Sequence, residues 1–164
     1  MRYTTRHAMI VGIWFAIFVY ALLIFQLSSA PMNAQPEPIQ TTYQTINETV
    51  KQTIVVPTGQ PQRYTPDYLH LFLFVGFGLL LYCGFFVIGG SARHFAVNLA
   101  WCLGTVYAAT DEYHQSFVPG RSADWKDVVA DASGVFLGIL IAIPLVFAII
   151  WLRKRLRSKW LDYV

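Results

Sequence analysis

The polar stretch Asp111-Glu-Tyr-His-Gln-Ser-Phe-Val-Pro-Gly-Arg-Ser-Ala-Asp-Trp-Lys-Asp-Val-Val-Ala-Asp131 interrupts a chain that is otherwise strongly apolar. It holds five carboxylates, one histidine, one glutamine and one arginine. Apolar runs lie on both sides of it, from Phe95 to Thr110 and from Val135 to Leu152. Ionisable residues between two membrane-length segments are expensive to keep in place, so we expect this stretch to form a functional site.

The composition of the 164 residues is typical of an integral membrane protein. Hydrophobic residues make up 55% of the chain and charged residues only 13%, and the mean hydropathy is +0.47. A soluble domain carries about twice this charged fraction. The net charge of +3 does not indicate nucleic-acid binding, because five of the twelve basic residues follow an apolar segment directly at the C-terminus. That placement is typical of a cytoplasmic anchor, and the lipid bilayer is the expected partner.

Four apolar segments are long enough to cross a bilayer, at about 8–27, 68–89, 95–115 and 126–152. The sequence therefore predicts an all-α, polytopic membrane protein with four transmembrane helices. Eight basic residues lie on the side of the two termini and four on the other side. The positive-inside rule then places both termini in the cytoplasm and the polar stretch at the outer face. Asp67 and His70, at the start of the second span, lie on that same outer side.

The end of the first span allows a second interpretation. Ser28-Ser29-Ala30 follows the apolar run and looks like a signal-peptidase site. The core of a signal peptide has roughly 7–15 apolar residues, and this run is longer. We therefore favour a retained transmembrane helix, with cleavage after Ala30 as the alternative.

The outer loop at 31–66 contains six of the eight prolines. Within it, four apolar residues recur at helical spacing, namely Tyr43, Ile46, Val50 and Ile54. This spacing predicts a short amphipathic helix on the membrane surface, although the threonine-rich composition would also fit a strand.

The boundaries of the third and fourth helices place the polar residues. If the third helix runs to about residue 117, Asp111, His114 and Gln115 share one face. Asp124 is placed to cap the N-terminus of the fourth helix. A stripe then follows this helix at spacings of three and four, through Asp124, Asp127, Asp131, Gly134 and Gly138.

The glycines of this stripe allow close approach of another helix, so we expect the stripe to pack against the third or second span. The same glycines could instead pair two copies of the chain in a homo-oligomer. Asp131 then lies partly out of water, and its carboxylate needs Arg121, a histidine, another donor or a proton.

Three interpretations of the polar stretch are open. It could be a structural network in which Arg121 and the two histidines neutralise the carboxylates. It could be a metal or general acid–base site, although no metal motif fixes the ion and no cofactor is specified. The candidate ligands are then His70, His114, Asp111, Glu112 and Asp131. It could also be a pocket for an anionic or amphipathic molecule, with Arg121 as the clamp.

At these residues the chain resembles the VanZ-like family of bacterial membrane proteins. The pattern from Asp111 to Arg121, followed by Asp124, Asp127 and Gly134, is similar to that family's signature. The preceding Asp67-Tyr-Leu-His70 resembles its shorter motif. The positions that match are Asp67, His70, Asp111, Glu112, His114, Gln115, Pro119, Gly120, Arg121 and Asp127.

Two positions depart from the family pattern. Tyr68 stands where a lysine is usual, which argues against a role that needs a cation there. Asp131 stands where many relatives have asparagine, and it adds a charge to the pocket.

The resemblance implies a multi-pass protein of the bacterial cell membrane, with one VanZ-like domain over residues 1–164. The family's namesake is associated with low-level resistance to teicoplanin, a lipid-bearing glycopeptide antibiotic. We therefore expect an outer-face pocket that binds or processes a cell-envelope amphiphile, such as an envelope lipid or a glycopeptide. The alternatives are a membrane-embedded hydrolase or transferase of lipid headgroups, and a structural or regulatory partner of an envelope complex.

The binding hypothesis gives each residue a role. Arg121 clamps an anionic group, Glu112 and His114 orient or protonate it, and Asp111 orients His114. The remaining ligand-binding candidates are Gln115, His70, Asp67, Asp124, Asp127 and Asp131.

Overall fold

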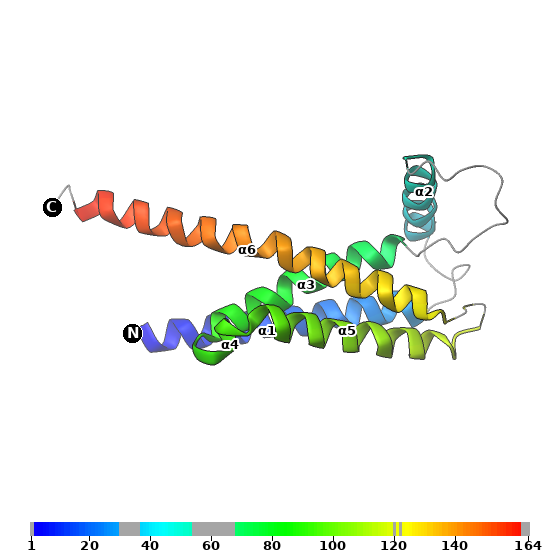
Figure 1. The fold of residues 1–164 in the computed structure, drawn as a ribbon, viewed down its shortest axis with the longest axis horizontal. Coiled ribbons are helices and arrows are strands. Elements are labelled where there is room, and N and C mark those ends of the chain that lie inside the picture. The colour runs from blue at the N-terminus through cyan, green and yellow to red at the C-terminus, as the bar shows by residue number, and fades with distance from the viewer. Residues whose placement is uncertain (1, 30–36, 54–67, 120, 122, 162–164) are drawn as a thin grey trace.

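The computed structural model describes residues 2–29, 37–53, 68–119, 121 and 123–161 (Figure 1). All regular secondary structure in these ranges is helical, as the sequence predicted. The helices are α1 (Arg2–Ser29), α2 (Glu37–Thr53), α3 (Tyr68–Ile88), α4 (Gly90–His94), α5 (Ala96–Gln115) and α6 (Trp125–Leu161).

Three of these helices are long and apolar enough to cross a membrane. They are Thr5–Ser29 within α1, Tyr68–Ile88, and Trp125–Leu156 within α6. They correspond to the first, second and fourth predicted spans. The third predicted span forms α5, whose 20 residues include a polar C-terminal end, and α5 is not among the three. Helix α6 continues to Leu161, beyond the predicted end at 152, because no helix breaker follows Trp151.

The long helices run side by side and alternate in direction along the chain (Figure 1). Helix α3 lies centrally and contacts α1, α5 and α6. The beginning of α1 and the end of α6 point to the same end of the bundle. At the other end, the C-termini of α1 and α5 meet the N-termini of α3 and α6. This arrangement brings the two sequence motifs together.

Close backbone packing joins α6 to α3. A Cβ atom on Gly134 would lie 2.6 Å from the carbonyl oxygen of Leu71, and one on Gly138 would collide with that of Val75. On the facing helix, a Cβ on Gly78 would collide with the backbone of Val135. The predicted packing of the glycine stripe is therefore confirmed, and its partner is the second span. Because the stripe is used within the chain, it gives no support to a homo-oligomer.

The interior of the bundle is filled by small and aliphatic residues around a few aromatic rings. Phe74, Phe77 and Leu81 of α3 pack against a row of alanines on α5 and against Val135 and Ile139 of α6. Large apolar side chains cover much of the outer surface. A bundle whose outside is this apolar is suited to a lipid environment rather than to water.

Helix α2 lies outside the bundle and contacts α3 (Figure 1). It confirms the short helix predicted in the outer loop, and the strand alternative is wrong. Ile46 is half-buried on it. Ile54 lies outside the described residues.

A buried polar cluster at one end of the bundle

Six polar side chains are buried together where α1 and α5 end and α3 and α6 begin. None is more than 5% exposed, although four are ionisable. We call this set the polar cluster; its members are Ser28, His70, Asp111, Glu112, Gln115 and Asp131. Burial of charged groups is costly unless other groups compensate for the lost water. The arrangement of partners within the cluster therefore indicates what it can do.

His70 lies at the centre of the cluster. Its Nδ1 atom is 3.6 Å from Oδ2 of Asp111 and 3.9 Å from Oδ2 of Asp131. Its Nε2 atom lies 3.4 Å from the hydroxyl oxygen of Ser28. Of the partners predicted for Asp131, a histidine is present in His70, at ion-pair distance but too far for a hydrogen bond. One imidazole connects residues of α1, α5 and α6.

Arg121 fixes the orientation of the Gln115 amide. Its Nη1 atom donates to Oε1 of Gln115 at 3.1 Å, and its Nη2 atom donates to the carbonyl oxygen of Leu27 at 3.4 Å. Because a guanidinium only donates, the amide atom facing it must be the oxygen. The amide nitrogen then faces inward, 3.0 Å from Oδ2 of Asp111 and 3.4 Å from Nδ1 of His70.

Asp111 is held by two donors on one of its oxygens. Oδ2 accepts from the hydroxyl of Ser28 at 2.8 Å and from Gln115. Oδ1 has no hydrogen-bond partner among the described residues and is buried. The hypothesis that Asp111 orients His114 is not supported by these contacts.

His114 instead faces α1. Its Nε2 atom lies 3.1 Å from the hydroxyl of Ser29, and its ring lies 4.5 Å from that of Phe25 between centroids. The physical reason is helical geometry. Around the helix, Gln115 is offset from Asp111 by about 40° in one sense and His114 by about 60° in the other, which turns His114 toward α1.

The connection between α5 and α6 is closed by local hydrogen bonds. Oδ1 of Asp124 accepts from the backbone N–H of Lys126 at 3.0 Å, which confirms the predicted N-cap. The backbone N–H of Asp124 in turn donates to Oε2 of Glu112 at 3.2 Å. Glu112 therefore ties the end of α5 to the start of α6.

The remaining predicted residues lie at the border of the cluster. We call His114, Arg121, Asp124 and Asp127 the rim, because all four are half-buried. Asp67 lies outside the described residues. Of the ten predicted site residues, five are in the polar cluster and four are in the rim.

Sequence reasoning missed the contribution of α1. Ser28 and Ser29 both bond to histidines of the site, and Leu27 supplies a carbonyl to Arg121. In the sequence, these two serines read only as part of a possible cleavage site. The sequence did hold one signal for them. The two serines end the first apolar run, which places them at the same level of the predicted membrane as the other motifs.

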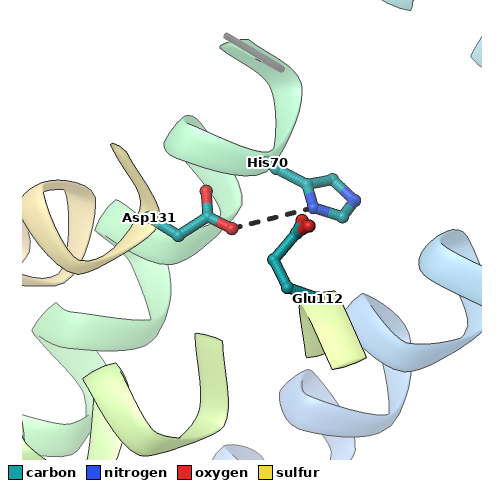
Figure 2. A group of neighbouring side chains, drawn as sticks. All are labelled: His70, Glu112 and Asp131. Atoms are coloured by element: carbon teal, nitrogen blue, oxygen red, sulfur yellow. Dashed lines mark ion pairs between the residues drawn. The ribbon is translucent and has the colours of Figure 1, made fainter. Parts of the chain in front are cut away.

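Three ligand-type residues of the cluster converge from three helices (Figure 2). His70 of α3, Glu112 of α5 and Asp131 of α6 each offer one ligand atom, and these atoms all lie within 4.8 Å of one another. This set can be considered as a metal site, and no local sequence motif would have identified it.

The fold and the cluster together define a class: helical membrane proteins with a buried histidine–carboxylate site at one end of the bundle. The VanZ/LLP1 family model matches residues 11–151, and the chain belongs to this family. The match spans α1 to α6 and includes the whole polar cluster. Neither a curated protein nor a solved structure matches the chain.

Proposed function

We propose that this protein crosses the cell membrane four times, with both termini in the cytoplasm, and binds the anionic headgroup of a cell-envelope amphiphile at its outer face. Helix α5 is the fourth span in this proposal. Its length matches the others, and its polar residues Asp111, Glu112 and Gln115 are buried among the other helices. An inward-facing polar end is compatible with a membrane helix.

The observation that carries the proposal is the set of hydrogen-bond partners of Arg121. Its hydrogen bonds go to a neutral amide and a backbone carbonyl, and among the described residues it forms no ion pair. A purely structural network would be expected to use this cation against the buried carboxylates. A guanidinium has five N–H donors, and the described residues use two of them, so the others are available to a ligand. A half-buried guanidinium of this kind suits a phosphate or carboxylate.

The rim gives the headgroup its other contacts. His114 lies on the α1 side of the site, where its imidazole can donate a proton or a hydrogen bond to a bound anion. Glu112 lies deeper and holds the backbone of Asp124. We therefore assign contact with the ligand to Arg121 and His114, and positioning of the rim to Glu112.

An apolar groove between α5 and α6 supports an amphiphile rather than a free anion. It has a volume of about 640 Å³. Its lining residues are Trp101, Val129, Ala132, Ser133, Phe136 and Leu137. The positions on α6 follow helical spacing from Lys126, an exposed cation in the first turn. An acyl chain in this groove would have its headgroup near the start of α6.

A binding measurement on the full chain in phosphatidylcholine nanodiscs tests the proposal. The probe is octyl phosphate, and an uncharged octyl ether serves as the control ligand. We expect Arg121→Gln to weaken octyl phosphate binding at least 10-fold. Arg93→Gln is the matched control variant, because Arg93 also donates to a backbone carbonyl, of Phe86, but lies at the opposite end. Equal binding by the wild type and by Arg121→Gln contradicts the proposal.

A second variant separates the headgroup from the chain. Ser133 is exposed in the groove, so Ser133→Trp fills the groove without changing the interior. We expect this variant to bind octyl phosphate more weakly and inorganic phosphate as the wild type does. Equal losses for both probes would show that the groove does not hold the alkyl chain.

The cellular consequence that we propose is altered susceptibility to glycopeptides such as teicoplanin, through the bound envelope amphiphile. Expression of the wild type and of Arg121→Gln in a susceptible bacterium tests it. We expect a change in teicoplanin susceptibility with the wild type only.

A further inference from the structure

We propose that His70, Glu112 and Asp131 bind a divalent first-row transition metal ion in the floor of the headgroup site. This inference rests on the proposed function, because it adds a cation to the same anion-binding site. It is a separate claim about three residues that Arg121 does not contact directly.

The ligand set and its spacing suit such an ion. One imidazole with two carboxylates is a combination found around Zn²⁺, and three protein ligands leave a position open. Around a tetrahedral Zn²⁺ ion, ligand atoms lie about 3.3 Å apart. The three observed ligand atoms lie within 4.8 Å of one another, and His70 Nδ1 is 3.9 Å from Asp131 Oδ2, so the side chains must move inward by up to about 1.5 Å to surround the ion.

The contacts of the other ring nitrogen of His70 suit a metal ligand. With Nδ1 as the ligand atom, its single lone pair points to the metal, and the 3.4 Å contact from the Gln115 amide nitrogen is given up. The proton then sits on Nε2, which faces the hydroxyl oxygen of Ser28. The hydroxyl of Ser28 in turn donates a hydrogen bond to Oδ2 of Asp111. Metal-bound histidines commonly donate their other N–H to a polar group backed by a carboxylate.

Nδ1 of His70 and Oδ2 of Asp131 face each other at 3.9 Å (Figure 2). This distance is too long for a hydrogen bond and leaves room for a cation bound by both atoms. Three carboxylates are buried in the cluster, and a divalent cation would stabilise them there.

The metal would complement Arg121 in binding a headgroup. The three ligands come from the walls of the bundle, and Arg121 lies at the rim. An anionic oxygen could occupy the open coordination position while the guanidinium contacts a second oxygen. A phosphate-bearing or carboxylate-bearing headgroup has both oxygens, and comparison of octyl phosphate with octanoate distinguishes the two.

The test uses the full chain in detergent, freed of metal with a chelator and then titrated with Zn²⁺ alone. We expect one Zn²⁺ per chain, and a rise in the temperature of unfolding on binding. Asp131→Asn and His70→Gln should each weaken Zn²⁺ binding at least 100-fold. Ser28→Ala, which removes only the support behind His70, should weaken it about 10-fold.

His94→Gln is the matched control, because His94 is an exposed histidine at the opposite end of the bundle. It should bind Zn²⁺ as the wild type does. Circular dichroism and gel filtration establish that each variant is folded. Stoichiometric binding by the wild type that is unaffected by Asp131→Asn and His70→Gln overturns the inference.

The two proposals fail in different ways. If the wild type binds no Zn²⁺ but binds octyl phosphate in a manner that depends on Arg121, the metal inference is wrong and the proposed function stands. If it binds Zn²⁺ through the three residues but no anionic amphiphile, the metal site stands and the proposed function is wrong.

Discussion

At the cluster end of the bundle several ionisable side chains are buried, whereas Arg6 and Arg93 at the opposite end lie on the surface. His70, Asp111 and Asp131 are at most 3% exposed. At the other end, Arg6 and Arg93 are exposed and donate to the last carbonyls of α3. The same helices thus treat charge in opposite ways at their two ends.

This difference separates anchoring from function. Exposed basic residues at helix ends cost little and fix the orientation of a membrane protein. Buried carboxylates lower the free energy of unfolding unless hydrogen-bond donors or cations stabilise them. Their presence at this end therefore indicates a role other than stability. The comparison predicts that substitutions at the cluster end change binding and stability in separable ways, while substitutions at the opposite end change neither strongly.

The largest effect is expected from His70→Phe. The phenyl ring fills a similar volume but leaves Asp111 and Asp131 facing a group that cannot donate. Loss of one member of a buried charged group costs about 3–5 kcal/mol. Chemical unfolding in detergent should show this loss, while His94→Phe at the opposite end should stay within about 0.5 kcal/mol of the wild type. If His70→Phe and His94→Phe lowered the free energy of unfolding equally, the proposed difference between the two ends would be wrong.

A loss of about 2–3 kcal/mol is expected from Gly138→Ala, between the two ends. The added methyl group would meet the backbone of Val75 and Leu79, which cannot move aside as a flexible side chain can. Gly12→Ala is the control, because nothing lies within 4 Å of a Cβ at that position. The control should be neutral or slightly stabilising, since alanine is the better helix former. A neutral Gly138→Ala would disprove the close α3–α6 packing.

A smaller change, of the opposite sign, is expected from Asp131→Asn in the metal-free protein. The substitution keeps the shape and removes one buried charge, so unfolding should require about 1 kcal/mol more free energy. The same variant should lose Zn²⁺ binding. If the metal-free variant is less stable than the wild type, the carboxylate stabilises the fold. A structural role would then explain its presence without a bound ligand.

An effect of about the same size, but destabilising, tests the cap at the start of α6. Asp124→Ala removes the acceptor for the Lys126 N–H and should cost about 1 kcal/mol. Asp124→Asn should cost almost nothing, because asparagine caps a helix equally well. If the two variants are equally destabilised, the charge of Asp124 matters more than its hydrogen bond.

The helices and the position of the cluster could be predicted from the sequence because their signals are local. The lengths of the apolar runs predict the helices, Pro119 follows the third predicted span in the sequence, and Asp124 caps α6. The spacing of Gly134 and Gly138 predicted a close contact with another helix. These features depend on neighbouring residues only.

The partners within the cluster could not be predicted, because they depend on the rotation of each helix about its axis. The rotation of α5 decides whether Asp111 or His114 faces His70 of α3. The convergence of His70, Glu112 and Asp131 from three helices has no signature along the chain. Ser28 was missed for the same reason, since its role depends on how deeply α1 packs beside α3 and α5.

The most direct test of the central claim compares the unfolding temperature of the wild type and Arg121→Gln, with and without octyl phosphate. We predict that the ligand-free variant unfolds within about 4 °C of the wild type, since it loses only hydrogen bonds to neutral groups. We also predict that octyl phosphate raises the unfolding temperature of the wild type but not that of the variant. A variant that is strongly destabilised yet stabilised by octyl phosphate as much as the wild type would show that Arg121 serves the structure and not the ligand.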